Sequence, residues 1–375
     1  MRLGINAILL EGKRTGVGRY LESLLREWSL APSGVEFILY YLNEEPRDAF
    51  LDAPQFTRRR IGIRKLGQSD VFEWELANNP VDMFFSPLYD LPMPLVPPAV
   101  ITIHDMIHEA FPESFNEVQL SYLREKTAYG VKMADVIITD SLFSREEITA
   151  RFPGAAGKIE VIPLAPSPLF KVAEVEAGFM EKRFGVKGPF IFYVGAVTPK
   201  RHIRPLFEAF CRIASRYPQW SVITIGRNVT FPHENLDELT AGYNRAIGRQ
   251  ALIYEEFVSD GDLLKLYNKA DIFAYLSTYE GFGMPPLEAM ACGAPVITST
   301  ASSLPEVVGD GALTVNPFDA GEVTEGLSRL MGDQILRDRL REKGFLRVKC
   351  FSWAATAEKT LSAIKKAFAK GVKAS

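Results

Sequence analysis

Short apolar runs alternate with amphipathic stretches along most of this chain of 375 residues. The runs are rich in β-branched and aromatic residues and end in polar turns, which is typical of strands buried on both faces. Strands that alternate with helices predict parallel sheets covered on both faces, so the fold class is α/β. The strand candidates are residues 1–10, 100–103, 136–139, 190–194, 220–225, 272–275 and 295–298. Helical candidates between them include residues 206–210 and 262–267.

The length of the chain favours two domains, because a single hydrophobic core rarely grows beyond about 250–300 residues. Residues 163–170 contain three prolines in eight positions, a composition typical of a linker. We therefore expect one Rossmann-like domain over residues 1–168 and a second over residues 169–352. Residues 353–375 are expected to form a separate C-terminal helix.

The C-terminal helix carries apolar residues at spacings of three and four, which predicts one buried stripe. This stripe consists of Ala354, Ala357, Leu361, Ile364 and Phe368. The other face carries four lysines, which we expect to be solvated, with a lipid-binding patch as the alternative. These lysines are Lys359, Lys365, Lys366 and Lys370.

The composition excludes several classes of protein. A net charge of −3 lacks the basic excess of a nucleic-acid-binding protein. Cys211, Cys292 and Cys350 are too few and too scattered for a disulfide framework or a zinc site, so a reducing cytoplasm is expected. No apolar run approaches the roughly 18–20 residues of a membrane span, and the N-terminus lacks the pattern of a signal peptide. Any membrane contact is therefore expected to be peripheral.

The strand candidate at 272–275 leads into a glycine-rich turn with a carboxylate at each end, Glu280 and Glu288. Pro285 and Pro286 suit the first turn of a helix, where a missing N–H costs little. A glycine turn before a helix leaves backbone N–H groups directed outward, and these attract phosphate. A carboxylate on each side can bind hydroxyl groups of the molecule that carries the phosphate. The pattern therefore predicts a site for a nucleotide sugar.

Two other loops are candidates for phosphate binding. Gly16 and Gly18 follow the first strand and let the backbone approach a ligand closely, although a plain strand-to-helix turn is the alternative. Leu21 stands where a dinucleotide-binding loop needs its third glycine, so such a site is disfavoured. Lys200 and Arg201 open a helix after the first strand of the second domain, where they would face a diphosphate with charge-assisted hydrogen bonds.

His104 lies just past the strand candidate at 100–103, on the side where open α/β sheets bind ligands. A single histidine in such a place is often structural, so the position alone does not assign a role. His108 has no further support as a functional residue, and we expect it to be structural.

Residues 280–288 resemble the E-x7-E signature of the retaining glycosyltransferases of family 4. Residues 289–298 and 302–308 are also similar to that family, and the likeness extends from Gly16 to about Trp353. Within the family, the chain is most similar to the mannosyltransferase-like group that builds bacterial surface polysaccharides. The resemblance implies the GT-B fold, in which two Rossmann-like domains face each other across a cleft and the C-terminal helix crosses back to the N-terminal domain.

The resemblance also implies roles for individual residues. Glu280 would contact hydroxyl groups of the sugar and Glu288 those of the ribose, while His104 would stabilise positive charge that develops on the sugar. The backbone groups near the donor would belong to Gly16, Gly18, Gly281, Phe282, Gly283 and Met284. The family usually has lysine in place of Arg201, often after an arginine, so the order of the basic pair looks swapped and the separate roles of Lys200 and Arg201 stay open.

The implied reaction transfers a hexose from a nucleotide diphosphate donor to a hydroxyl group of a glycan or lipid-linked glycan, with retention of configuration. GDP-mannose is the expected donor, on likeness to the subgroup alone. Lys200 and Arg201 would stabilise the departing diphosphate, so no metal or other cofactor is expected. Asp260 and Asp262 form a D-x-D pattern like the metal motif of other glycosyltransferases, but Ser259 and Asp260 suit the cap of a helix better.

Three alternatives stay open at this point. The donor could be UDP-glucose or another nucleotide sugar, the chain could bind sugar nucleotides without transferring the sugar, or it could be a Rossmann-type oxidoreductase. A cluster of basic residues is either a lipid-docking surface or an exposed loop or strand edge. This cluster consists of Arg58, Arg59, Arg60, Arg64 and Lys65.

Overall fold

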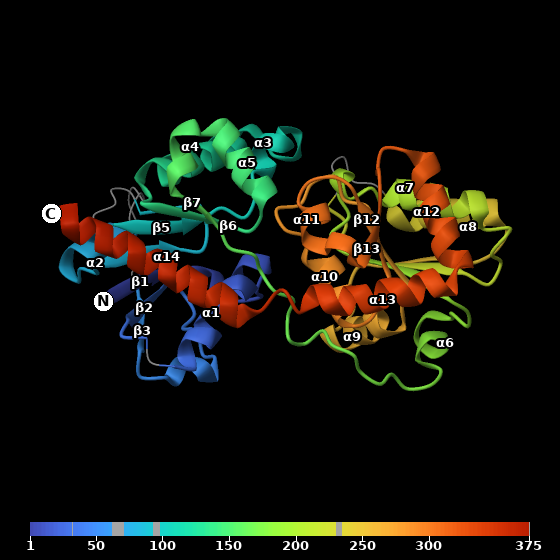
Figure 1. Cartoon of the computed structure of the whole chain (residues 1–375), viewed down its shortest axis with the longest axis horizontal. Helices are drawn as coiled ribbons and strands as arrows, with labels where there is room; N and C mark the ends of the chain where they lie inside the picture. The colour runs from blue at the N-terminus through green and yellow to red at the C-terminus, as the bar shows by residue number, and fades with distance from the viewer. Residues whose placement is uncertain (32, 62–70, 93–97, 230–234, 375) are drawn as a thin grey trace. The chain divides into compact units, whose positions relative to one another are not determined.

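The computed structural model describes the whole chain except residue 32, residues 62–70, 93–97 and 230–234, and residue 375. The chain divides into two compact units (Figure 1). The N-terminal unit comprises Met1–Leu164 and Ser352–Ser375, and the second unit comprises Ala165–Phe351. The first boundary falls within the proline-rich segment 163–170.

The N-terminal unit contains a seven-stranded parallel sheet with the order β3-β2-β1-β4-β5-β6-β7. Ile5 of β1 lies opposite Leu39 of β2 and Phe85 of β4, and all three side chains are fully buried. The order of strands reverses between β1 and β4, which makes this position a topological switch point. The strands are β1 (Arg2–Asn6), β2 (Glu36–Tyr41), β3 (Phe56–Arg60), β4 (Met83–Ser86), β5 (Ala99–Thr102), β6 (Val136–Thr139) and β7 (Ile159–Val161).

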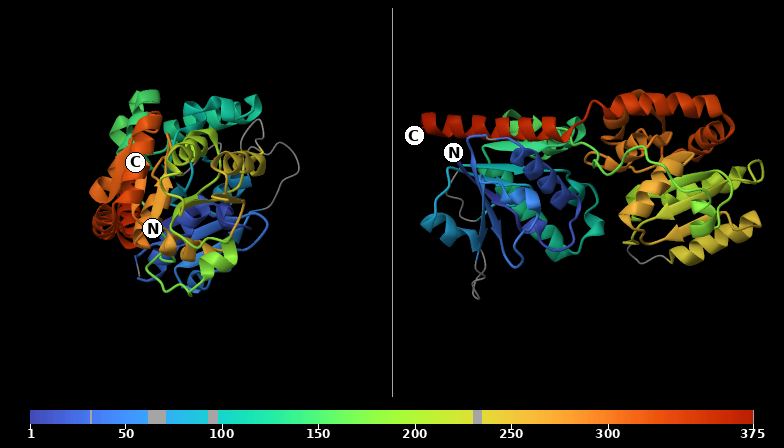
Figure 2. Two further views of the ribbon diagram at one scale, coloured as in Figure 1. Left: turned by 90° about the vertical axis from the view of Figure 1, so that its right-hand side faces the viewer. Right: turned by 90° about the horizontal axis from the view of Figure 1, so that it is seen from below.

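Helix α14 (Trp353–Ala374) packs beside α1 (Gly16–Ser29) and against strands of the N-terminal sheet. The right view of Figure 2 shows α14 running along this unit. The indole N–H of Trp28 on α1 donates to the carbonyl of Ala357 on α14 at 3.0 Å, in a buried position. The remaining helices of this unit are α2 (Val71–Asn78), α3 (Ile107–Ala110), α4 (Glu117–Met133) and α5 (Leu142–Arg151).

The buried stripe of α14 is wider than the apolar spacing predicts and partly displaced from it. Ala357 and Ile364 are buried as expected, but Ala354 is exposed, so this part of the prediction was wrong. Alanine and threonine make up most of the buried residues of this helix, and neither residue type marks a buried face by hydrophobicity alone. The other buried residues are Trp353, Thr356, Thr360, Ala363 and Ala367, and the four lysines are exposed.

The second unit contains a six-stranded parallel sheet with the order β10-β9-β8-β11-β12-β13. Its switch point lies between β8 and β11. The strands are β8 (Phe190–Val194), β9 (Ser221–Ile225), β10 (Leu252–Glu255), β11 (Ile272–Tyr275), β12 (Val296–Ser299) and β13 (Ala312–Val315). The helices are α6 (Phe179–Phe184), α7 (Ile203–Ile213), α8 (Leu236–Ile247), α9 (Asp260–Lys269), α10 (Met284–Ala291), α11 (Leu304–Val308), α12 (Ala320–Gly332) and α13 (Gln334–Val348).

Most predicted strands are confirmed to within one residue at each end, and every residue of β11 is buried as the apolar run predicts. The exception is the N-terminal candidate at 1–10, because β1 ends at Asn6. The side chain of Asn6 accepts a hydrogen bond from the N–H of Ile8 at 3.3 Å, and a short 3-10 turn follows. An asparagine side chain that binds the backbone two residues on favours a turn over an extended strand.

The basic cluster lies partly on the edge strand β3, where its described members have partners. Arg58 pairs with Asp52 at 3.0 Å, and Arg59 pairs with Glu75 at 2.7 Å. Arg64 and Lys65 lie outside the described residues. The partnered arginines support a strand edge more than a lipid-docking surface. Among the described residues, no helix combines the length and the apolar character that crossing a bilayer requires.

Candidate active site

The two loops that flank the switch point of the second unit carry most of the predicted site residues. One loop follows β8 and contains Lys200 and Arg201, and the other follows β11 and contains Glu280. Since β8 and β11 are neighbours in the sheet, their carboxyl ends meet at one edge and bring the two loops together. The backbone carbonyl of Lys200 accepts hydrogen bonds from the N–H and the hydroxyl group of Thr278, at 2.8 and 3.0 Å, which joins the loops directly.

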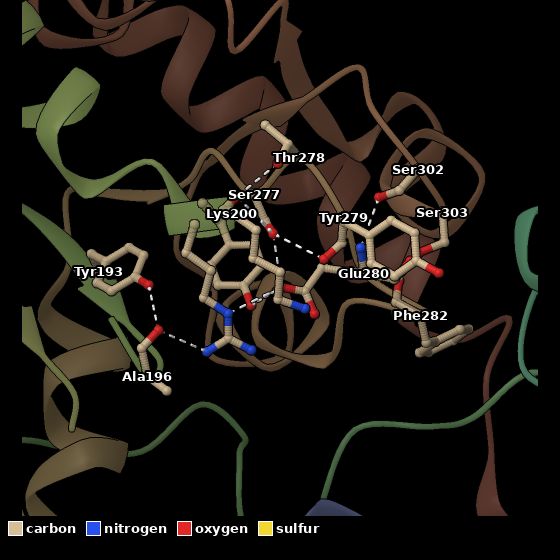
Figure 3. Close-up of polar contacts among 12 residues, drawn as sticks. Tyr193, Ala196, Lys200, Ser277, Thr278, Tyr279, Glu280, Phe282, Ser302 and Ser303 are labelled. Carbon is tan, nitrogen blue, oxygen red and sulfur yellow. Dashed lines mark hydrogen bonds and ion pairs between the residues drawn. The ribbon is translucent and has the colours of Figure 1, made fainter. Parts of the chain in front are cut away.

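Three donors converge on one oxygen of the Glu280 carboxylate, which lies among the labelled side chains in Figure 3. The hydroxyl groups of Tyr275 and Ser277 each donate to Oε1 at 2.8 Å, and Nε of Arg201 donates to the same atom at 3.1 Å. Within the part of the chain that the structure describes, Oε2 of Glu280 has no hydrogen-bond partner. The carboxylate is therefore fixed through one oxygen, while the other can accept a hydrogen bond from a ligand. We refer to Tyr275, Ser277, Glu280 and Arg201 as the Glu280 cluster.

Arg201 is the cation of this cluster. Its Nη1 donates to the carbonyl of Ala196 at 3.3 Å, and its guanidinium lies 5.7 Å from the centre of the Tyr275 ring. Burial disfavours both charges, but their attraction outweighs it: the pKa of Glu280 is lowered and that of Arg201 is raised from their ordinary values. Both groups therefore stay charged at every pH near neutrality.

The structure separates the two basic residues that sequence reasoning treated as a pair. Arg201 binds Glu280, whereas the ammonium group of Lys200 lies 5.6 Å from the centre of the Tyr279 ring. A 3-10 turn over Pro199–Arg201 directs the two side chains differently. Burial raises the pKa of Glu280, but Arg201 and then the positive charge of Lys200 lower it below its ordinary value. Two cations beside one carboxylate leave a net positive loop, which suits an anionic ligand.

The turn between Glu280 and α10 depends on glycine. Gly283 caps α10 with φ of 100°, and a Cβ atom there would lie 2.5 Å from Cδ2 of Leu304. Prolines occupy the first turn of α10, as the sequence predicts. Gly281 and Gly283 are buried and Met284 is half-buried at the start of the helix. The ring of Phe282 packs against Phe351, with 5.8 Å between ring centres, so only its backbone is a candidate for ligand binding.

Two serines outside the predicted set hold this turn in place (Figure 3). The hydroxyl oxygen of Ser302 accepts a hydrogen bond from the N–H of Glu280 at 3.1 Å. Ser303 lies within donating distance of two carbonyl oxygens, 2.8 Å from that of Glu280 and 2.9 Å from that of Phe282. Ser302 has φ of 55°, one of two non-glycine residues with positive φ in the described chain. Such backbone strain is often found at functional sites.

Glu288 lies on α10, in the second turn after Gly283. Its Oε2 accepts a hydrogen bond from the hydroxyl group of Tyr267 at 2.9 Å. Tyr267 belongs to α9 and is fully buried, and its pKa is raised well above the ordinary value by burial and by the charge of Glu288. The tyrosine therefore remains a hydrogen-bond donor that fixes the carboxylate.

In the N-terminal unit, His104 lies two residues beyond the end of β5. Its Nδ1 is 2.7 Å from Oδ2 of Asp140, which directly follows β6. His108 is buried, with Nε2 3.4 Å from the hydroxyl oxygen of Thr127, which fits the structural role expected for it.

Gly16 and Gly18 occupy the first turn of α1 after the cap residue Thr15. A Cβ atom on Gly18 would lie 2.5 Å from the carbonyl oxygen of Leu9, so packing within this unit explains that glycine. A Cβ atom on Gly16 would meet open space. Packing within the described part of this unit therefore explains why residue 18 is a glycine, but it does not explain the glycine at residue 16.

The D-x-D pattern is part of a helix terminus. The side chain of Ser259 accepts a hydrogen bond from the N–H of Asp262 at 3.1 Å, which makes Ser259 the N-cap of α9 as predicted. Asp262 also lies 3.6 Å from Arg183. Among the described residues, no group of three or more His, Cys, Asp or Glu side chains has the arrangement of a metal site.

Sequence reasoning missed the residues that orient the charged groups: Tyr275, Ser277, Ser302, Ser303 and Asp140. One signal was available for three of them, since Tyr275, Ser277 and Asp140 lie at or just beyond the end of an apolar run. Ends of neighbouring parallel strands lie at the same edge of a sheet. The serines at 302 and 303 had no such signal, because they approach Glu280 from a loop that follows β12.

Comparisons with known proteins agree with this architecture. Residues 176–347 match the family "Glycosyl transferases group 1". The chain is 31% identical to the O-antigen chain mannosyltransferase B of Escherichia coli over 379 aligned positions, which cover 94% of this chain and 96% of that protein. It is also 30% identical to the O-antigen chain mannosyltransferase RfbU of Salmonella typhimurium over 227 positions, covering 60% and 59% of the two chains.

Solved structures show the same fold. Sucrose-phosphate synthase from Thermosynechococcus elongatus superposes with a TM-score of 0.75 at 20% identity, covering 98% of this chain and 99% of that one. The Anabaena protein HepE, solved in complex with UDP, has a TM-score of 0.74 at 18% identity, covering 97% and 99%. The two parallel sheets are those of the GT-B fold. With a relative at 31% identity along nearly its whole length, the chain belongs to the glycosyl transferases of group 1 and is a glycosyltransferase.

Proposed function

We propose that this glycosyltransferase moves mannose from GDP-mannose to a hydroxyl group of a glycan or lipid-linked glycan during synthesis of a surface polysaccharide, at the cytoplasmic side of the membrane. The observation that carries this proposal is the likeness to the O-antigen chain mannosyltransferase B over 94% of the chain. The relative matches both units, so the likeness includes the acceptor side as well as the donor side.

The geometry of the Glu280 cluster supports a sugar nucleotide as the ligand. Oε1 of Glu280 is held by three donors, so Oε2 is presented in a fixed direction toward a sugar hydroxyl group. Glu288, fixed by Tyr267, is the candidate for the ribose hydroxyl groups. The backbone N–H groups of Gly281, Gly283 and their neighbours at the start of α10 are the candidates for the phosphate.

Retention of configuration is part of the proposal. The bond between the anomeric carbon and the phosphate oxygen breaks, and the bond to the acceptor oxygen forms on the same face of the sugar. The proton of the acceptor hydroxyl group passes to an oxygen of the departing phosphate. Lys200 and Arg201 stabilise the negative charge on the diphosphate, which replaces the function of a metal ion.

A donor assay tests the proposal. The purified chain is incubated in EDTA with radiolabelled GDP-mannose, GDP-fucose, UDP-glucose or ADP-glucose and with lipid-linked mannosides as acceptors. We expect label in the acceptor with GDP-mannose, an α-linked product by NMR from the α-linked donor, and at least tenfold less product with the E280A variant. Transfer from a different donor would change the assigned sugar. Donor binding without any transfer would support a non-catalytic nucleotide-sugar-binding protein instead.

A further inference from the structure

The imidazole of His104 lies between oxygens supplied by two neighbouring strand ends of the N-terminal sheet. Asp140 follows β6 and places Oδ2 2.7 Å from Nδ1 of the ring. Pro87 follows β4 and places its carbonyl oxygen 3.2 Å from Nε2. Since β4, β5 and β6 are adjacent in the sheet, the three groups meet at one edge.

Both neighbours of the ring are hydrogen-bond acceptors that carry no hydrogen of their own. A neutral imidazole has one N–H, so one of its nitrogens would direct a lone pair at an oxygen. A protonated imidazolium donates from both nitrogens and satisfies both contacts. Burial opposes this charge, but Asp140 outweighs it through its charge and its hydrogen bond, and the pKa of His104 is raised above its ordinary value.

The surroundings of the ring fix its position. Tyr20 of α1 packs edge-to-face against the imidazole, with 4.9 Å between ring centres, and the hydroxyl group of Ser144 on α5 donates to the backbone carbonyl of His104 at 3.0 Å. The hydroxyl group of Tyr20 stays neutral, because burial raises its pKa above the ordinary value. The charge of Asp105, the next residue in the chain, also acts on the ring.

Asp140 is almost fully buried, and its carboxylate pairs with the imidazole of His104. The exposed fraction of the side chain is 2%, and Oδ1 has no hydrogen-bond partner in the described part of the chain. A buried carboxylate with one unsatisfied oxygen is costly for stability. A purely structural carboxylate would be expected to satisfy both oxygens, so this arrangement indicates a functional reason for keeping it.

We propose that Asp140 is a positioning residue that holds His104 as an imidazolium, so that its Nε2–H donates a hydrogen bond to an oxygen of the substrate. The substrate oxygen would replace or share the contact that Nε2 makes with Pro87. The donation to a substrate rests on the proposed function, whereas the pairing with Asp140 does not. The resemblance implies that His104 stabilises positive charge that develops on the sugar, and the proposed role differs from this. An imidazolium beside the sugar opposes positive charge on the sugar ring and favours negative charge on the leaving oxygen.

Imidazole NMR tests the pairing without any substrate. The chain has four histidines, so a sample labelled with ¹⁵N-histidine gives a simple spectrum, and the H104Q variant assigns the ring of His104. We expect His104 to be protonated on both nitrogens at neutral pH with a pKa above 6.5, and we expect D140N to lower that pKa by about one unit or more. His108 and His202, whose pKa values are lowered by burial, serve as internal controls that D140N leaves unchanged. A pKa of His104 below 6.5, or one unchanged in D140N, would overturn the proposal.

Kinetics test whether the cation acts in transfer. In D140N, kcat should fall by about tenfold or more, while KM for the donor changes less than threefold. As the pH rises, D140N should lose its activity at a lower pH than the unmodified chain does. D140E, which keeps the carboxylate, should restore part of kcat. Equal loss in D140N and D140E with an unshifted pH profile would indicate a merely structural residue. Circular dichroism shows whether D140N folds. If it does not, NMR compares the pKa of His104 in D140E with that in the unmodified chain. A pKa that differs by less than 0.3 units between the two and lies below 6.5 in both would again overturn the proposal.

Discussion

The two sheets have matching strand orders around their switch points, yet they place different chemistry at the edge where we expect ligands to bind. In the second unit, the Glu280 cluster joins a carboxylate to an arginine, with hydroxyl groups of Tyr275 and Ser277 on the same oxygen. In the N-terminal unit, Asp140 is joined to a histidine, and one of its oxygens has no hydrogen-bond partner among the described residues. The first pair joins a carboxylate to a guanidinium that does not lose its proton near neutrality, whereas the second pair joins a carboxylate to an imidazole, whose charge depends on its surroundings.

We expect this difference to reflect distinct tasks on similar scaffolds. A permanent ion pair keeps the shape and field of a binding loop constant, which suits recognition of a diphosphate that is always charged. A histidine whose charge depends on a neighbouring carboxylate suits a donor that acts during the reaction. Variants of one pair should therefore change properties that variants of the other pair leave unchanged.

The largest effect is expected from breaking the pair in the second unit. E280A leaves Arg201 buried without its carboxylate, which should lower the free energy of unfolding by about 3 kcal/mol and transfer by at least tenfold. R201A should lower transfer by a similar factor. Chemical denaturation and initial rates measure the two quantities.

E280Q is the matched control, since it keeps an acceptor for Tyr275 and Ser277 and removes only the charge. It should cost less stability than E280A while losing most of the transfer. Near-normal activity in both E280A and R201A would contradict the assignment of this site.

The two pairs should respond to pH in opposite directions. Glu280 has a lower pKa when folded than its ordinary 4.5, so its contribution to stability is present above pH 4.5 and is lost as the pH falls through the folded value. His104 has a higher pKa than its ordinary 6.5, so its contribution is complete below pH 6.5 and is lost as the pH rises through the folded value.

Urea denaturation between about pH 3 and pH 9 measures both effects. The free energy of unfolding of the unmodified chain should exceed that of E280Q by less as the pH falls. It should exceed that of H104Q by less as the pH rises. If both free-energy differences changed in the same direction with pH, the expected contrast between the Glu280–Arg201 pair and the His104–Asp140 pair would be contradicted.

A smaller effect is expected at Ser302, which holds Glu280 from a strained backbone. S302A loses the acceptor for the N–H of Glu280 and keeps the unfavourable φ, so it should lower stability by about 1–2 kcal/mol. S302G loses the same contact but relieves the strain, so it should be more stable than S302A by about 1 kcal/mol. Thermal unfolding compares the two variants, and an S302A variant as stable as S302G would show that the strain is not significant.

Tyr267 offers a test of Glu288 that leaves the Glu280 cluster intact. Y267F removes the hydrogen bond to Oε2 of Glu288, which should weaken nucleotide binding by about 1 kcal/mol, or roughly fivefold. Calorimetric titration with GDP measures the change. Unaltered affinity would mean that Glu288 does not bind the ribose or does not need this anchor.

The smallest effect is expected at the D-x-D pattern. The cap of α9 uses the side chain of Ser259 and the backbone of Asp262, so D262N should change stability by no more than about 0.5 kcal/mol. Transfer by this variant should be within twofold of normal, and EDTA should not inhibit the unmodified chain. Inhibition by EDTA that Mg²⁺ or Mn²⁺ reverses would show that a metal takes part.

Much of the fold could be predicted from the sequence because its elements have strong local signals. The run that forms β11 is apolar on both faces, and Gly283 with two following prolines marks the start of α10. The face of α14 was harder to define, since alanine and threonine give little contrast between buried and exposed positions. Local pattern therefore predicted elements better than it predicted which face of a helix is buried.

The site was predictable where one residue carries the chemistry and not where residues act together. Glu280 and His104 could be proposed from position and resemblance, but their partners come from other strands and loops. The pairing of Arg201, rather than Lys200, with Glu280 depends on a 3-10 turn that the sequence does not reveal. The link between His104 and Asp140 spans 36 residues and follows only from the order of strands in the sheet.

Binding of GDP in EDTA by isothermal titration calorimetry tests the division of tasks most directly, with the unmodified chain, R201A and D140N compared under one set of conditions. We expect GDP to bind the unmodified chain, R201A to weaken this binding at least tenfold, and D140N to bind GDP within twofold of the unmodified chain. Loss of binding in D140N as large as in R201A would contradict the account, as would the absence of GDP binding by the unmodified chain.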